Sequence, residues 1–264
     1  MTEKTSILRK LHAGPKILVL PNAWDVASAR IFEAAGFPAL GTTSAGVANS
    51  LGYADGERIS RDEMLDVVRR IARAVSIPVT ADVESGYGDP VSTAQAVVDA
   101  GAAGLNLEDT TGEHPDSLTP LAAQVKTIET IRSKTDLVIN ARTDVFLASI
   151  GDPATRLESA IQRLNAYRQA GADCLFAPGV RDAETIGKLA RAVHGPLNIL
   201  ATVGTPPIAE LERLGVARVS IGSGAMRAGM GLTQRIAQEL LERGTYSSFT
   251  GGALPYADAN RLFE

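Results

Sequence analysis

The sequence contains very little cysteine, because Cys174 is the one thiol among its 264 residues. A single cysteine forms neither a disulfide within the chain nor a cluster of thiolate metal ligands. Cys174 lies in the apolar stretch DCLFAPG, which is typical of a strand. We therefore interpret it as a buried, unreactive thiol and assign it no chemical role.

Long apolar runs and blocks of like charge are also missing. No stretch of about 18 apolar residues occurs, and the start MTEKTSILRK has no apolar signal core, so we expect no membrane contact and a cytoplasmic location. Lys and Arg total 26 against 30 Asp and Glu, for a formal charge of −4. Nucleic-acid binding needs a clustered basic surface, so we expect no such partner.

The composition is that of a globular protein, with 45% hydrophobic and 21% charged residues. The length suits two small domains or one (β/α)8 barrel, which commonly uses about 250 residues. No linker or low-complexity stretch divides the chain. We therefore predict a single domain over residues 1–264.

Short apolar runs alternate with amphipathic segments along the chain. The eight runs cover residues 14–23, 34–44, 76–84, 99–109, 134–144, 169–179, 194–202 and 212–222. In every second run a helical pattern stops at a glycine and a strand follows, as expected of a glycine that ends a helix. Segments such as 62–75 and 153–170 show helical periodicity between the runs.

This alternation predicts the α/β class and a parallel sheet with right-handed crossovers. Eight strand-helix units predict a (β/α)8 TIM barrel. An open doubly wound sheet is the alternative, but LPNAWDVASAR lacks the glycine fingerprint that such sheets carry after the first strand. A short helix at 7–12 is expected before the barrel, and a tail, 244–264, after the eighth helix.

Polar residues follow the carboxyl ends of the predicted strands, which is where active sites of this fold are built. Asp82 and Glu84 are two positions apart and are expected on one face of the third strand. Glu108 ends the fourth strand and Arg142 the fifth. Further polar residues at strand ends are Asn22, Trp24, Thr43, Ser44, Asn106, Asn140, Asp144, Asn198 and Thr202.

Converging carboxylates repel one another unless they share protons or hold a cation. No histidine or cysteine lies beside Asp82, Glu84 and Glu108, so the ligand set is all oxygen and favours Mg²⁺ first and Mn²⁺ second. The alternative is a set of structural carboxylates with Arg142 as their ion-pair partner. Because three adjacent strands contribute acids, we predict the metal site.

Two further motifs leave alternatives open. SIGSGAMRAG, at 220–229, has the layout of a phosphate cradle, but an ordinary tight turn has the same pattern; Arg227 within it can reach an anionic substrate or a surface acid. His114, in TTGEHPDSL, is either an acid or base on a loop over the site or a surface histidine. His12 and His194 lie near strand starts and are expected to be solvated or capping.

The chain resembles the isocitrate lyase and phosphoenolpyruvate mutase superfamily over nearly its whole length. The matching stretches, in the superfamily's order, are LPNAWDVASARIFEAAGF, GTTSAGVANSLGYADGERIS, PVTADVESGYGD, GAAGLNLEDT, VINARTD and NILATVGTP. The resemblance implies a homotetrameric barrel whose eighth helix is exchanged between neighbours, with the tail 244–264 packed on a neighbouring subunit. It also implies a Mg²⁺ ion that holds a 2-oxo acid or its enolate.

The resemblance assigns roles residue by residue. Asp82 approaches the metal most directly, and Glu84 and Glu108 act through water. The implied substrate contacts, together with the strand-end Trp24, are Ser44, Ala45, Gly46, Arg142, Asn198 and Arg227, and the implied acid near the reacting centre is Asp55. Metal and arginine together stabilise negative charge as it develops on an enolate.

The loop TTGEHPDSL departs from the superfamily, since it lacks both the cysteine acid of the carbon–carbon lyases and the lysine of the phosphonate branches. We expect a Mg²⁺-dependent lyase that cleaves a carbon–carbon bond of a small 2-oxo or 2-hydroxy acid through an enolate, including decarboxylation of an oxaloacetate-like substrate. The alternatives are a phosphonopyruvate-type phosphorus–carbon mutase or hydrolase, and a non-catalytic 2-oxo-acid binding protein.

Overall fold

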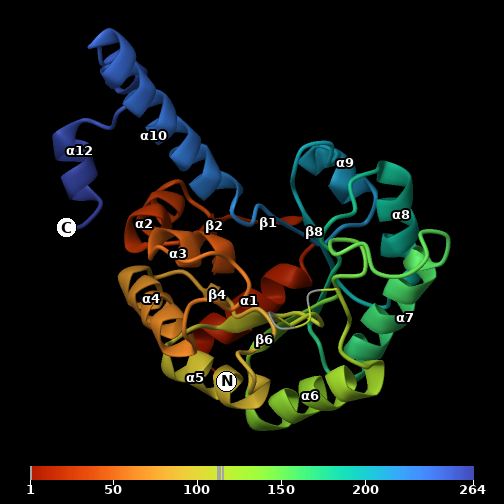
Figure 1. Cartoon of the computed structure of the whole chain (residues 1–264). Coiled ribbons are helices and arrows are strands. Elements are labelled where there is room, and N and C mark those ends of the chain that lie inside the picture. Colours follow the sequence, from red (N-terminus) through yellow and green to blue (C-terminus); the bar gives the residue numbers. More distant parts are fainter. Residues whose placement is uncertain (1, 112–113, 115) are drawn as a thin grey trace.

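The computed structural model describes residues 2–111, 114 and 116–264, and Figure 1 shows a ring of parallel strands surrounded by helices. The strand order is β1-β9-β8-β7-β6-β5-β4-β3-β2. The strands are β1 (Leu18–Leu20), β2 (Asn22–Ala23), β3 (Leu40–Thr42), β4 (Val79–Asp82), β5 (Gly104–Leu107), β6 (Val138–Arg142), β7 (Cys174–Phe176), β8 (Leu197–Leu200) and β9 (Arg218–Ser220).

The first predicted strand is divided at Pro21 into β1 and β2. Proline has no N–H to donate to a neighbouring strand, which accounts for the break. β1 pairs with β9 and β2 pairs with β3, so the two halves of one strand close the sheet. The predicted (β/α)8 barrel is therefore confirmed.

The helices lie where the apolar periodicity places them. Before and around the barrel they are α1 (Glu3–His12), α2 (Val26–Ala34), α3 (Ser44–Ser50), α4 (Arg61–Ala74), α5 (Pro90–Asp99), α6 (Leu121–Lys134), α7 (Arg156–Gln169), α8 (Ala183–Ala192) and α9 (Ile208–Arg213). Gly36 and Gly171, two of the predicted helix stops, have φ values of 91° and 108°, which glycine adopts without strain. Outward-facing strand residues such as Ala81 and Leu105 pack on these helices in the main core.

α1 closes the amino-terminal end of the barrel. Its Leu8 is fully buried and packs with Leu18, Leu20 and Val138. His12, at the end of the same helix, is only 5% exposed and contacts a side chain of β9. The expectation that His12 is solvated or capping is therefore wrong, because α1 turns this residue into the protein interior.

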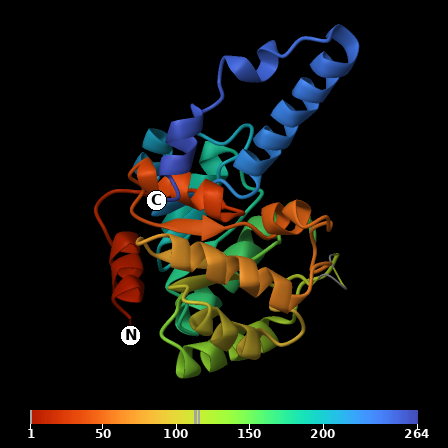
Figure 2. The same cartoon turned by 90° about the vertical axis from the view of Figure 1, so that its left-hand side faces the viewer.

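The last segment leaves the barrel as an arm made of α10 (Gly224–Arg243), α11 (Ser247–Thr250) and α12 (Tyr256–Arg261). Figure 2 shows α10 extending away from the barrel before the chain turns back. Apolar side chains on the arm are exposed, including Leu241 at 88% and Tyr256 at 83%. Among the described residues, the helices are too short or too polar to cross a membrane.

Candidate active site

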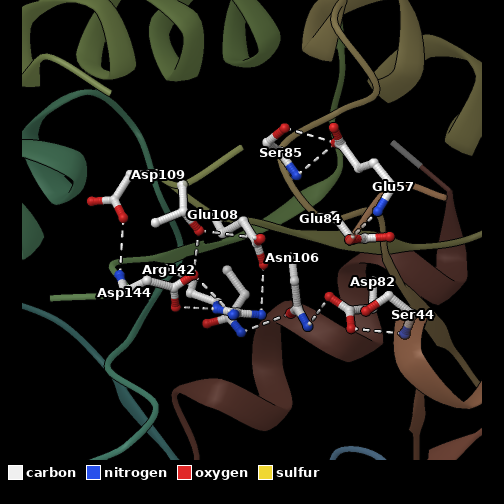
Figure 3. Close-up of polar contacts among 12 residues, drawn as sticks. Ser44, Glu57, Asp82, Glu84, Ser85, Asn106, Glu108, Asp109, Arg142 and Asp144 are labelled. Atoms are coloured by element: carbon white, nitrogen blue, oxygen red, sulfur yellow. Dashed lines mark hydrogen bonds and ion pairs between the residues drawn. The ribbon is translucent and has the colours of Figure 1, made fainter. Parts of the chain in front are cut away.

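Asp82 ends β4 at the carboxyl end of the barrel. Its Oδ2 accepts a hydrogen bond from the Ser44 amide at 3.0 Å, and its Oδ1 accepts one from Asn106 Nδ2 at 3.3 Å (Figure 3). Its own amide donates to Thr42 Oγ1 at 2.8 Å. Neighbouring strands thus hold the carboxylate in place from both sides.

Glu84 lies just beyond the strand rather than in it. β4 ends at Asp82 and Glu84 has a φ of 52°, so the strict alternation predicted for this pair stops before Glu84. The Glu84 carboxylate accepts hydrogen bonds from the Glu57 amide at 2.8 Å and from the Tyr87 hydroxyl at 3.2 Å. Burial, followed by repulsion from Asp55 and Asp82, raises its pKa to about 7.

Glu57 ties two loops of the mouth together. Its Oε1 accepts hydrogen bonds from the Ser85 amide, the Ser85 hydroxyl and the Tyr87 amide, at 3.2, 2.7 and 2.8 Å. Because its amide also donates to Glu84, the loop that carries Asp55 is joined at several points to the loop after β4. Glu57, Glu84 and Tyr87 all have positive φ, a conformation that is strained for these residue types and that persists here under these hydrogen bonds.

Arg142 ends β6 and lies between two acids. Its Nη1 pairs with Glu108 Oε2 at 2.6 Å, while Nε and Nη2 donate to the two oxygens of Asp144 at 2.6 and 2.9 Å (Figure 3). Burial lowers the pKa of Arg142, but Glu108 and Asp144 raise it by more. Burial raises the pKa of Glu108, against the opposing effect of Arg142. Arg142 thus pairs with rim carboxylates, as expected from the alternative to a metal site that the sequence left open.

Asp55 and the start of α3 face Asp82. Loss of hydration and the charge of Asp82 raise the pKa of Asp55, against hydrogen bonds from Ser44 and Gly56. The predicted carboxylate cradle at Ser44, Ala45 and Gly46 is the first turn of α3. Two of the amides in this turn are already hydrogen-bonded: Ser44 N donates to Asp82, and Gly46 N donates to Thr43 Oγ1. Trp24 packs beside this turn, 3.0 Å from where a Cβ on Gly46 would stand.

The remaining predicted residues lie in different environments. Asn198 is the second residue of β8, not its end; it is fully buried and hydrogen-bonded to Ser220. Arg227 is exposed on α10. His114 is exposed and lines an open cavity of about 1200 Å³ beside Glu108. The turn after β9 is held by Asn22, whose Oδ1 accepts hydrogen bonds from two consecutive amides of that turn at 2.9 Å each, which favours the ordinary turn over the phosphate cradle.

Residues 8–241 match the sequence pattern described as phosphoenolpyruvate phosphomutase. The chain belongs to this family. An uncharacterized protein of Mycobacterium tuberculosis is 38% identical over 221 residues, which cover 83% of this chain and 83% of that protein. The oxaloacetate decarboxylase of Rhodopseudomonas palustris is 33% identical over 225 residues, which cover 81% of this chain and 75% of that enzyme.

A solved structure agrees with the family assignment. Oxaloacetate acetylhydrolase in complex with oxalate superposes with a TM-score of 0.86 at 25% identity, over 98% of this chain and 93% of that chain. The predicted membership of the isocitrate lyase and phosphoenolpyruvate mutase superfamily is therefore confirmed, and with it the expectation of a lyase or mutase rather than another class of enzyme.

The carboxylate oxygens at the mouth of the barrel are suitable ligands for a divalent cation. Among the described residues, no three His, Cys, Asp or Glu side chains form a closed metal-binding group. Mg²⁺ nevertheless commonly takes one or two carboxylates and keeps several waters. Asp82 carries a well-positioned carboxylate, and burial first and neighbouring carboxylates second raise the pKa of both Asp55 and Glu84, so these acids face an excess of negative charge. That excess is what a cation would neutralise.

The structural roles of three residues were not predicted from the sequence: Glu57, His12 and Arg218. Glu57 has no periodic or motif signal, because its role depends on a contact with a distant loop. Arg218 did carry a signal: ARVSIG places it in alternation with apolar Val219, on the inward face of a strand. An inward arginine in a barrel strand is unusual enough to be singled out.

Proposed function

We propose that this protein is a Mg²⁺-dependent lyase that cleaves a carbon–carbon bond of a small 2-oxo or 2-hydroxy acid through an enolate. The observation that carries this proposal is the gathering of Asp55, Asp82, Glu84 and Glu108 around one mouth with Arg142 among them. Similarity to oxaloacetate decarboxylase and to oxaloacetate acetylhydrolase supports an oxaloacetate-type substrate.

The residues of the chain have separate tasks in this proposal. Asp82 would hold the metal directly, and Glu84 and Glu108 would hold it through water. The first turn of α3 offers backbone amides to the substrate carboxylate, with the Ala45 amide not engaged by the described residues. When bound, Mg²⁺ supplies electrophilic stabilisation of the negative charge that develops on the substrate.

Proton transfer is assigned to Asp55, whose raised pKa suits an acid or base near the substrate. Arg142 adds positive charge and orients Glu108. Trp24 forms the apolar side of the pocket. Asn198, Arg227 and His114 stay as proposed substrate contacts: Asn198 is buried in β8, Arg227 is exposed on α10, and His114 lines the cavity beside Glu108.

A substrate panel tests the reaction. Oxaloacetate, 2-methylisocitrate, 2,3-dimethylmalate and phosphonopyruvate are each incubated with protein, with Mg²⁺ or with EDTA. Release of a 2-oxo acid with loss of the parent diacid supports the lyase; phosphate release or formation of phosphoenolpyruvate supports phosphorus–carbon chemistry instead. Binding by thermal shift without turnover would indicate a non-catalytic binding protein. Because free Mg²⁺ decarboxylates oxaloacetate slowly, an Asp82→Ala sample at equal Mg²⁺ serves as the blank.

We also propose that residues 1–264 act as one domain in a cytoplasmic homotetramer, with α10 and the tail 244–264 packed on a neighbouring subunit. The exposed apolar side chains of the arm support this arrangement, since Leu241 and Tyr256 are largely in solvent in the isolated chain. Light scattering should give a mass four times the 27.6 kDa of one chain. Deletion of 244–264 should lower the mass of the particle to fewer than four chains.

A further inference from the structure

Arg218 on β9 is a fully buried arginine that contacts no carboxylate among the described residues. It is 0% exposed and ranks first by volume among the fully buried side chains. Its Nη1 lies 3.4 Å from His12 Nε2, its Nη2 lies 3.4 Å from Asn106 Oδ1, and its Nε has no partner in the described part of the chain. A buried cation costs several kcal/mol unless opposite charge offsets it.

The neighbours that touch or flank the guanidinium are neutral. His12 Nδ1 donates to the Leu8 carbonyl at 2.8 Å, which leaves Nε2 to accept from Arg218. Burial, and then the charge of Arg218, lower the pKa of His12 to about 4, so it is neutral at pH 7. Burial raises the pKa of the Cys174 thiol to about 11, so Cys174 also carries no charge. Neither residue offsets the charge of Arg218.

Burial lowers the pKa of Arg218, and Cys174 and then Asp82 oppose that shift, so Asp82 is the carboxylate that acts on Arg218. Asn106 stands between them: its Oδ1 accepts from Asn140 Nδ2 at 2.8 Å and faces Arg218 at 3.4 Å, while its Nδ2 donates to Asp82 Oδ1 at 3.3 Å. The two acceptor contacts fix the amide so that its donor end faces Asp82. Because both side chains are buried, the attraction between the two charges is screened far less than at a surface.

We infer that Arg218 is a positioning residue that acts through Asn106: a buried counter-ion that offsets the charge of the Asp82 carboxylate while no cation is bound. This role rests on the proposed function only in that Asp82 is there taken as the metal ligand. The charge pair itself exists without metal. Removing Arg218 should therefore weaken the metal-free protein and, because a cation is removed from the vicinity of the site, strengthen Mg²⁺ binding.

The first experiment is a double-mutant cycle in EDTA with Arg218→Met, Asp82→Asn and the double variant, followed by thermal unfolding. If Arg218 is the counter-ion of Asp82, Arg218→Met should lower the unfolding midpoint by at least about 3 °C more in the parent than in the Asp82→Asn background. Equal shifts in both backgrounds overturn the inference. If Arg218→Met gives no folded protein, Arg218→Gln takes its place, and Arg218→Lys, which keeps the charge, should retain most of the coupling.

The second experiment is calorimetric titration of the same variants with Mg²⁺. Arg218→Met should bind at least about threefold tighter than the parent, because the repulsion between two cations is removed. If Arg218 has only a structural role, Arg218→Met should bind Mg²⁺ as tightly as the parent or more weakly, and that result overturns the inference. The matched control is Arg132→Met, which removes an arginine paired with Asp173 at the other end of the barrel and should leave Mg²⁺ affinity unchanged.

The two proposals fail separately. If Asp82→Asn binds Mg²⁺ as tightly as the parent, the proposed metal site is wrong, while the cycle in EDTA still decides the role of Arg218. If Asp82→Asn loses Mg²⁺ binding and the cycle shows no coupling, the metal site stands and the counter-ion does not.

Discussion

The acidic residues at the two ends of the barrel differ in how they are paired with cations. At the amino-terminal end, Asp173 is paired with both Arg9 and Arg132 and also accepts a hydrogen bond from the Ile139 amide, beside the apolar plug of α1. At the carboxyl end, acids outnumber cations, and the pKa of both Asp55 and Glu84 is raised by burial and by neighbouring carboxylates. The acid at the amino-terminal end is thus paired with two arginines, whereas at the carboxyl end Glu108 and Asp144 share Arg142, and Asp55 and Glu84 face other acids.

The strongest test of this contrast is to remove an acid from each end. Asp82→Ala should reduce turnover by at least about 100-fold and abolish Mg²⁺-dependent thermal stabilisation, because a metal ligand is lost. Asp173→Ala should do the reverse, lowering thermal stability while turnover per folded molecule stays the same. Turnover of both variants, corrected for folded fraction by circular dichroism, makes the comparison. Full activity in Asp82→Ala would remove the metal proposal.

The plug can be weakened by Leu8→Ala, which leaves a cavity between α1 and the fully buried Leu20. The free energy of unfolding should fall by about 2–5 kcal/mol, as for other buried leucines. Urea unfolding with and without Mg²⁺ measures the loss, and the stabilisation by Mg²⁺ should be unchanged. The exposed Ile7→Ala on the same helix is the control, and an equal loss there would argue against a tightly packed plug.

At the amino-terminal end of the barrel, His12 should make stability depend on pH. Its pKa is about 4 in the folded protein and about 6.5 in the unfolded chain. Between these values the unfolded chain binds more protons, so this contribution is present above pH 6.5 and is lost as the pH falls toward 4. The loss should reach roughly 2 kcal/mol at pH 5. Denaturant unfolding of the parent and of His12→Gln over pH 5–7 isolates it from the titration of carboxylates. Parallel curves for the two proteins would contradict a buried neutral His12.

The smallest expected effect concerns Glu57, which joins the loops of the mouth. Glu57→Ala removes the acceptor for Ser85 and Tyr87, so the loop that carries Asp55 should be held less firmly and kcat/KM should fall by about tenfold. Glu57→Gln keeps one acceptor oxygen and should recover most of the activity. Glu63→Ala, which removes part of the capping box of α4 on the surface, is a control expected to lower stability slightly without loss of activity.

Much of the fold could be predicted because its signals are local. Gly36, Gly101, Gly171 and Gly215 end helices at the predicted positions, and all have positive φ. The acids of the mouth were also predicted, since parallel strands present their carboxyl ends together. The alternation at Asp82 and Glu84 was wrong in detail, because the strand ends at Asp82 and the next loop turns through positive φ. Nothing in local periodicity marks where a strand gives way to a strained loop.

The sequence by itself determined the strand-helix order, the family and the acidic composition of the mouth, because periodicity, glycine stops and motifs act over a few neighbouring residues. Only the tertiary structure decided which charges meet. Arg218 contacts His12 across 206 positions and Asn106 across 112. Electrostatic energies depend on distance and burial in three dimensions, so the same acids and arginines could have been paired differently without any change in their local patterns.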